Sequence, residues 1–174
     1  MHLPVEKRLE AYSARLLAYA NALCRDREAA QDLFHEGVVR ALQARNIPDA
    51  EPAFRAWLFT ILRNVWIDQL RSIRRKAEIE EEFAADLAPA PVSLETVVVD
   101  AFAIRQAYAC LSVGHREILA LVDVTGFSYE EAAAIIGVPA GTVMSRVSRA
   151  RRALAARLAD DNIVSLARRR AGGK

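Results

Sequence analysis

The chain has 174 residues and a net charge of +2; 53% of its residues are hydrophobic and 26% are charged. This balance, with only 7 glycines and 6 prolines, excludes a disordered protein and predicts folded domains. No segment approaches the roughly 20 apolar residues that cross a bilayer, and residues 1–10 lack the apolar core of a signal peptide. We therefore expect a cytoplasmic protein with no membrane partner, whose affinity for nucleic acid, if any, comes from local clusters of arginine.

Three helices are predicted in the first half of the chain. Apolar residues recur at steps of three and four up to Leu23, so the first helix should end near Cys24, and Asp26 could cap the second. The second helix carries an apolar stripe, made of Ala30, Leu33, Phe34, Gly37, Val38, Ala41 and Leu42. The polar residues largely outside this stripe are free for a partner, and they are Gln31, Asp32, His35, Glu36 and Arg40.

A turn-rich loop and a long basic helix follow. Residues 43–53 contain several turn formers, and Pro52 could occupy the first position of the third helix. That helix is predicted from Phe54 to about Arg75, with an apolar face formed by Phe54, Trp57, Leu58, Ile61, Leu62 and Val65. Its arginines lie mainly off that face, and they are Arg55, Arg63, Arg71, Arg74 and Arg75.

The composition changes sharply after the basic helix. The segment from Glu78 to Ser93 is acidic and contains alternating Ala and Pro, which predicts a solvated linker that tethers two domains without acting as a rigid spacer. Helical periodicity returns beyond Ser93 and continues through Val122.

The stretch from Gly126 to Arg152 has the pattern of a helix-turn-helix. Ser128 and Glu131 form a capping box, Gly137 ends the first helix in a left-handed cap, and Pro139 starts the second helix. The second helix has a buried stripe, made of Val143, Val147, Ala150 and Leu154. Its exposed face carries short polar groups and arginines that suit a DNA major groove, namely Thr142, Ser145, Arg146, Ser148, Arg149 and Arg152.

These patterns together predict an all-α fold of two small helical domains joined by a flexible linker, the C-terminal domain being a helix-turn-helix. The expected divisions are a first domain over 1–77, a linker over 78–96, a second domain over 97–160 and a basic tail over 161–174.

Simpler interpretations exist for both polar surfaces. The arginines near the end of the helix-turn-helix, including Arg151, could be a solvated face placed favourably toward a helix C-terminus. The ordered coincidence of cap, glycine turn, proline start and arginines favours DNA binding instead. The polar face of the second helix, taken alone, is better explained as solvated surface.

The cysteines and histidines do not suggest a metal or catalytic site. Cys24 and Cys110 lie in apolar helical surroundings without closely spaced partners, which predicts structural burial. A zinc site joining them to His35 and His115 is conceivable but lacks the usual ligand spacing. We expect no cofactor, no metal and no enzymatic activity, because there is no reactive constellation and no glycine-rich phosphate loop.

Three stretches together resemble the extracytoplasmic-function sigma factors of bacteria, and they are Asp32 to Glu36, Phe54 to Asn64 and Phe127 to Arg152. Their order and spacing match the second and fourth conserved regions of that family, with no third-region domain between them. The resemblance covers most of the chain and implies a signal- or stress-responsive factor that directs RNA polymerase core to promoters. The alternative is a stand-alone helix-turn-helix regulator, which would need its own sensor or dimerisation domain.

The resemblance also implies which residues bind. The clamp helices of the largest polymerase subunit would be bound by Asp32, His35, Glu36 and Arg40. The unpaired strand of the minus-ten element would be captured by the loop from Asn46 to Ala53 and by the third helix, with candidate residues Asn46, Asp49, Thr60, Arg63, Asn64 and Arg71. The minus-thirty-five duplex would be bound by Ser128, Tyr129, Thr142, Met144, Ser145, Arg146, Ser148, Arg149 and Arg152. Further implied partners are the polymerase flap region and an anti-sigma factor.

Two positions depart from the family pattern. Met144 stands in the recognition helix where Lys or Arg is common, which leaves the minus-thirty-five preference open. His35 and Gly37 replace the usual Gln and Thr of the polymerase-binding helix, which is expected to adjust polymerase affinity without changing the role. Trp57 and Trp66 are expected to be core or boundary residues and not platforms for bases.

Overall fold

The computed structural model describes residues 4–24, 26–81 and 99–171, and within these ranges the chain forms helices and no strand, which confirms the all-α prediction. The N-terminal half consists of α1 (Val5–Leu23), α2 (Arg27–Gln43) and α3 (Glu51–Glu81). The C-terminal half contains α4 (Val99–Ala109), α5 (Val113–Leu119), the short π-helix η1 (Ala120–Val124), α6 (Tyr129–Ile136) and α7 (Ala140–Ala171). No described helix is long and apolar enough to serve as a membrane span.

The first two helices follow the predicted stripes closely. Leu9, Leu16 and Leu23 of α1 are buried, and the Asp26 carboxylate accepts a hydrogen bond of 2.7 Å from Ala29 N at the start of α2. Gly37 is buried against α3, where an added Cβ would lie 2.4 Å from Leu62 Cδ1. This glycine therefore allows close helix packing and does not share the exposed face of His35.

Three details of the N-terminal half differ from the prediction. Leu42, assigned to the buried stripe, is 46% exposed in the last turn of α2. The third helix begins at Glu51, so Pro52 is its second residue, and it extends to Glu81, beyond Arg75. Phe59 was not placed on the apolar face, yet it is fully buried because the C-terminal half covers it.

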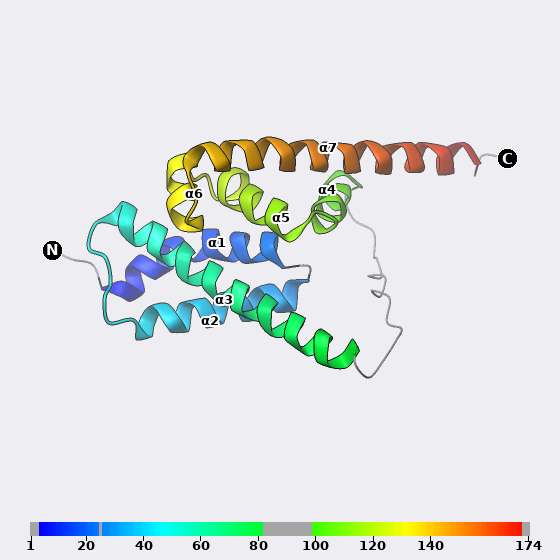
Figure 1. Cartoon of the computed structure of the whole chain (residues 1–174). Coiled ribbons are helices and arrows are strands. Elements are labelled where there is room, and N and C mark those ends of the chain that lie inside the picture. Colours follow the sequence, from blue (N-terminus) through cyan, green and yellow to red (C-terminus); the bar gives the residue numbers. More distant parts are fainter. Residues whose placement is uncertain (1–3, 25, 82–98, 172–174) are drawn as a thin grey trace.

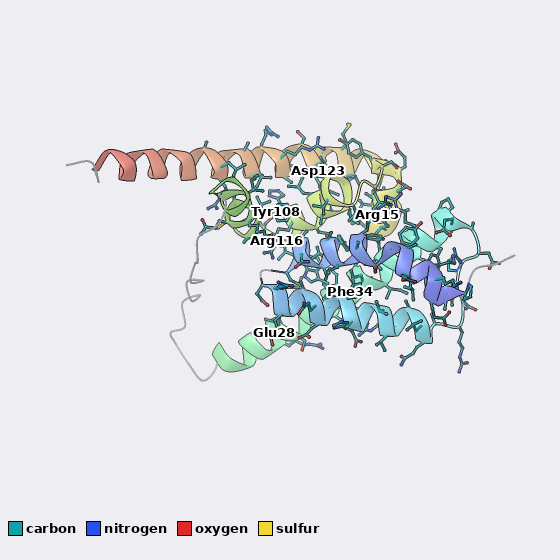
Figure 2. All side chains as sticks on the ribbon, turned by 180° about the vertical axis from the view of Figure 1, so that it is seen from behind. Arg15, Glu28, Phe34, Tyr108, Arg116 and Asp123 are labelled. Atoms are coloured by element: carbon teal, nitrogen blue, oxygen red, sulfur yellow. The ribbon has the colours of Figure 1, made fainter. Side chains whose placement is uncertain are left out.

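The C-terminal half is arranged under one long helix. Figure 1 shows α7 lying across α4, α5 and α6, with its last turns extending beyond them. The turn between α4 and α5 is held by Tyr108, whose hydroxyl donates to Arg116 O over 2.9 Å, and by Arg116, whose Nη1 donates to Ala109 O over 3.3 Å (Figure 2). Arg116 is only 4% exposed, so this turn is a fixed part of the core.

The two halves pack together and share one hydrophobic core. Leu16 and Phe59 of the first half belong to the same buried cluster as Leu119 and Phe127 of the second. Figure 1 shows α1 lying beneath α5, and α3 passing beside α6 in its first turns and then running away from the C-terminal half. The sequence predicted two domains and a connecting linker but did not predict this contact. The linker was expected over 78–96, and most of that range lies outside the described residues.

The cysteines differ in their surroundings. Cys24 is half-buried, and this burial raises the pKa of its thiol to about 11, which keeps the thiol protonated and unreactive at neutral pH. Cys110 is exposed, so the prediction of burial was wrong for this residue, because it lies just past the last residue of α4 in a turn and outside the packed face of the helix. Within the described ranges, no group of His, Cys, Asp or Glu could hold a metal ion.

Candidate nucleic-acid and protein-binding surfaces

The helix-turn-helix is built as its sequence predicts. Ser128 Oγ accepts a hydrogen bond of 3.1 Å from Glu131 N, while the Glu131 carboxylate accepts one of 2.8 Å from Ser128 N, which completes the capping box of α6. Gly137 ends α6 with a φ of 78°, a left-handed conformation that favours glycine. Pro139 lies just before the first residue of α7, and its carbonyl accepts from Thr142 N and Val143 N.

The two faces of α7 separate cleanly along the helix. Val143, Val147 and Ala150 are buried, and Leu154 is half-buried. Most of the candidates for the minus-thirty-five duplex are exposed, namely Ser128, Met144, Ser145, Ser148, Arg149 and Arg152, while Tyr129, Thr142 and Arg146 are half-buried. An exposed row of small hydroxyls and arginines on a helix that can enter the major groove is chemically suited to DNA.

The arginines of α7 have different partners. Arg151 forms an ion pair of 2.6 Å with Asp123 of η1, so its charge is used within the C-terminal half. Arg149 Nε donates to Ser145 O over 3.3 Å and its Nη2 donates to Ser145 Oγ over 3.5 Å, while the side chain as a whole is exposed. Arg151 is thus a structural arginine, whereas Arg149 and Arg152 on the same helix are exposed.

The candidates for the minus-ten strand are spread along α3 and the loop before it. Asn46 and Asp49 are exposed in that loop. Thr60 is half-buried and donates its hydroxyl to Ala56 O over 2.8 Å, whereas Asn64, one turn further along the same face, is exposed. Arg71 is exposed near Asp68, and at 1.5 Å per residue it lies about 10 Å along the helix from Asn64.

Arg63 is the exception in this set. Its Nε donates to Glu117 Oε1 of α5, and the two side chains are only 18% and 9% exposed. A residue predicted to face DNA is therefore covered by the C-terminal half in this arrangement.

The loop before α3 is fixed by Arg8 of α1, a residue that the sequence analysis missed. The Arg8 guanidinium donates to Pro48 O over 3.0 Å and to Asp49 O over 3.2 Å, and it pairs with Glu51 Oε2 at 3.0 Å. It also lies over the ring of Phe54, with Cζ 3.6 Å from the ring centroid. Arg8 is 8% exposed, and no local pattern in the sequence distinguishes it from a solvated helix arginine.

The predicted polymerase-binding residues share one exposed face of α2. Asp32, His35, Glu36 and Arg40 are all exposed. Arg40 pairs with Glu36 at 2.8 Å and with Asp68 of α3 at 3.4 Å, which raises the pKa of Arg40 and orients its side chain. Val39 and Leu42 beside them are 45% and 46% exposed. A mixed acidic and apolar helix face of this kind is suited to a protein partner.

Two family models match the chain. Residues 9–76 match sigma-70 region 2, and residues 101–154 match sigma-70 region 4. The first match spans most of α1 to α3, and the second spans most of α4 to the middle of α7.

Curated and solved relatives agree with these matches. The ECF RNA polymerase sigma factor EcfG of Rhodopseudomonas palustris is 41% identical over 146 residues, covering 82% of this chain and 78% of the relative. The sigma factor RpoE of Bartonella quintana, solved in complex with the anti-sigma factor NepR, superposes with a TM-score of 0.69 at 33% identity and covers 88% of this chain and 96% of that one. CnrH, solved in complex with the cytosolic domain of CnrY, gives a TM-score of 0.63 at 25% identity over 90% of this chain and 88% of that one.

Proposed function

Because this chain belongs to the ECF RNA polymerase sigma factors of the sigma-70 family, we propose how its two halves divide the work of promoter recognition. The protein directs RNA polymerase in the initiation of transcription. In our proposal the segment 1–77 binds core polymerase and opens the minus-ten element, 78–96 is a linker, and 97–160 reads the minus-thirty-five duplex. The factor catalyses nothing itself and acts in the bacterial cytoplasm, where core polymerase works.

The observation that supports this division best is the helix-turn-helix with its outward row of serines and arginines on α7. Run-off transcription with core polymerase on a genomic fragment library tests the function directly. We expect transcripts that start downstream of a common pair of elements only when this chain is present. The same promoters transcribed equally by core polymerase alone would contradict the proposal.

We propose that Arg146 and Arg149 hold the minus-thirty-five duplex while Ser145 and Ser148 lie near its bases. Replacing either arginine with alanine is expected to weaken binding to all sequences alike and to reduce the slope of log affinity against log salt by about one. Binding of promoter DNA by holoenzyme, measured across salt concentrations, checks this. Arg151→Ala is the matched control on the same helix, since Arg151 is paired with Asp123 and should leave the slope unchanged. Equal slopes for all three variants would rule out the assignment.

We propose that the loop before α3 sets the preference for the minus-ten element, together with Thr60, Asn64 and Arg71 on α3. Arg8 holds this loop through backbone carbonyl oxygens, which any sequence provides, so the loop should accept new side chains without losing its anchor. Exchanging residues 46–50 for those of a related sigma factor is expected to transfer that factor's minus-ten preference. A promoter-library transcription assay measures this, and an unchanged profile would place the preference elsewhere.

We also propose an anti-sigma factor as a partner of this chain, because a similar solved chain, the sigma factor RpoE of Bartonella quintana, is in complex with the anti-sigma factor NepR. An open pocket of about 540 Å³ lies between the halves and is lined by residues of α1, α2, α4 and η1. Ile104 and Val124 at this pocket are 49% and 45% exposed, which offers an apolar recess to such a partner. Polymerase core, through its clamp helices and flap region, and promoter DNA complete the proposed set of partners.

A further inference from the structure

The helix-turn-helix carries a large apolar side chain on the exposed face of its second helix. Met144, the fifth residue of α7, is 58% exposed, whereas Val143 and Val147 of the same helix are buried. Among the side chains that the structure describes in α6 and α7, no other large apolar side chain is exposed. Met144 does not belong to the hydrophobic core, so its position on the helix decides what it can contact.

The strip of α7 that runs from Met144 through Ser148 to Arg151 offers little free charge. These residues are four and three positions apart and therefore share one side of the helix. Arg151 is engaged in its ion pair with Asp123 at 2.6 Å, and Ser148 is exposed. In a helix-turn-helix, the first turns of the second helix reach the base edges of the major groove. Met144 lies in those turns, so this strip meets a base with an apolar group and a hydroxyl.

Gly141 leaves an open space next to Met144. It lies three residues earlier on the same side of α7, and helical side chains lean toward the N-terminus, so Met144 extends over this turn. A Cβ added at Gly141 would have no heavy atom within 4 Å beyond its chain neighbours and the backbone of α7 itself. The space therefore admits a group the size of a methyl. A left-handed φ does not explain the glycine either, because the described glycines with positive φ are Gly126 and Gly137.

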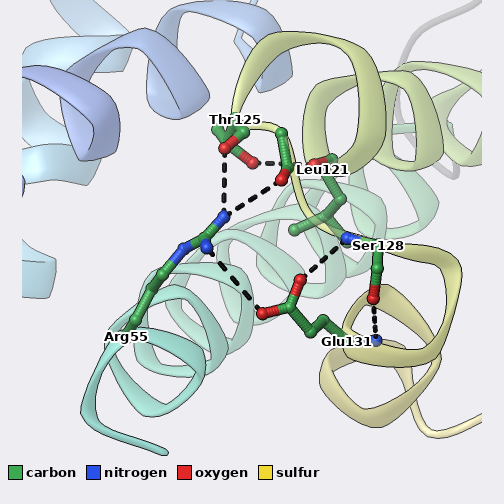
Figure 3. A network of polar contacts seen from close by, with 6 residues as sticks. Arg55, Leu121, Thr125, Ser128 and Glu131 are labelled. Carbon is green, nitrogen blue, oxygen red and sulfur yellow. Dashed lines mark hydrogen bonds and ion pairs between the residues drawn. The ribbon is translucent and has the colours of Figure 1, made fainter. Parts of the chain in front are cut away.

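The support that presents α7 is fixed within the C-terminal half. Thr125 Oγ1 donates to Leu121 O over 2.8 Å in the turn before α6 (Figure 3). The capping box of Ser128 and Glu131, drawn in the same view, holds the first turn of α6. In the free chain Arg55 of α3 also reaches this turn and donates to Thr125 O over 3.2 Å. An apolar contact discriminates between bases only where its geometry is defined, so a fixed support suits base readout by α7.

We propose that Met144 selects a thymine in the minus-thirty-five element through an apolar contact with the C5-methyl group of that base, which enters the space beside Gly141. This inference rests on the proposed function, which assigns the duplex to α7. In the major groove the methyl group distinguishes thymine from the other bases, and apolar side chains are the groups that contact it. A phosphate contact positions the protein on any sequence, whereas a methyl contact acts at one base pair. Met144 thereby sets a preference that phosphate contacts cannot set.

The inference is tested by removing the methyl group from the DNA. Holoenzyme is titrated with promoter duplexes in which single thymines of the minus-thirty-five element, found by run-off transcription, are replaced by deoxyuridine. Deoxyuridine pairs as thymine does and lacks only the methyl group. For the unaltered chain we expect one such replacement to weaken binding roughly fourfold, which corresponds to the loss of one buried methyl group.

Variants of the chain assign this loss to one side chain. Met144→Gln keeps the length of the side chain and removes its apolar end, so it should bind the thymine and deoxyuridine duplexes equally. Met144→Leu remains apolar and should retain the preference for thymine. Gly141→Ala favours the helix but fills the space, so the preference should fall to one or below. The matched control is Ile73→Gln, which removes another exposed apolar side chain, on α3, and should keep the fourfold ratio.

Several results would overturn the inference. An element in which no thymine responds to deoxyuridine would show that the methyl group is not read. A fourfold ratio that persists in Met144→Gln would assign the methyl contact to another residue. Weaker binding of Met144→Gln to core polymerase in the absence of DNA would make Met144 part of a protein contact. Holoenzyme that binds no minus-thirty-five duplex specifically contradicts the proposed function as well, whereas specific binding that ignores the methyl group contradicts this inference alone.

Discussion

Replacing Asp32 and Glu36 with lysine is expected to weaken binding of the chain to core RNA polymerase by roughly 30-fold or more. Both carboxylates lie on the exposed face of α2, where Glu36 is held by Arg40. Reversing them changes the charge of this face by four units, next to the exposed apolar side chains of Val39 and Leu42. Like charges that meet at an interface reduce the binding free energy, because they repel each other and both lose their hydration.

The measurement is a titration of labelled chain with core polymerase, with helicity monitored to show that the fold is intact. Glu6→Lys/Glu10→Lys makes the same change in charge on an exposed part of α1 and should bind core nearly as well as the unaltered chain. If the α2 variant binds as tightly as the α1 variant, the docking surface lies elsewhere on the molecule.

Arg8→Met is expected to lower the free energy of unfolding by about 2 to 4 kcal/mol and the melting temperature by about 5 to 15 °C. Methionine keeps part of the packing over Phe54 but leaves Pro48 O and Asp49 O without their donor. The carboxylate of Glu51 is 56% exposed and returns to water at little cost, so most of the loss comes from the two carbonyl groups and the buried ring contact.

Calorimetry or circular dichroism during heating measures this effect. Arg15→Met is the matched control, because Arg15 is an arginine of the same helix that is exposed (Figure 2). The control should change the melting temperature by little, since surface substitutions usually cost less than about 0.5 kcal/mol. Equal destabilisation by the two variants would mean that the Arg8 contacts contribute nothing specific.

Much of the local structure could be predicted because its causes are local. The capping box of Ser128 and Glu131, the left-handed Gly137 and the cap at Asp26 each depend on residues within three or four positions of one another. The buried stripes of α1, α2 and α7 follow from the helical period in the same way. These signals were sufficient to predict the helix-turn-helix and the order of the helices.

The contacts between the halves could not be predicted for the opposite reason. Arg55 and Arg63 lie off the apolar face of α3 with the spacing of ordinary solvated arginines, and nothing within a turn of either residue indicates Glu131 or Glu117. Phe59 next to them gave only a weak signal, an aromatic residue outside the stripe that is fully buried here. Arg8 was missed similarly, since its partners lie 40 or more residues away in the sequence.

The edge-to-face contact of Phe59 with Phe127 gives the opening of the molecule a thermal signature. Separating the halves hydrates two rings that are otherwise almost completely buried, and hydration of apolar surface raises the heat capacity. Because the hydrophobic contribution weakens on cooling, the contact between the two halves should become less stable as the temperature falls below ambient. The interface between the halves is therefore expected to be the part of this fold that is most sensitive to cold.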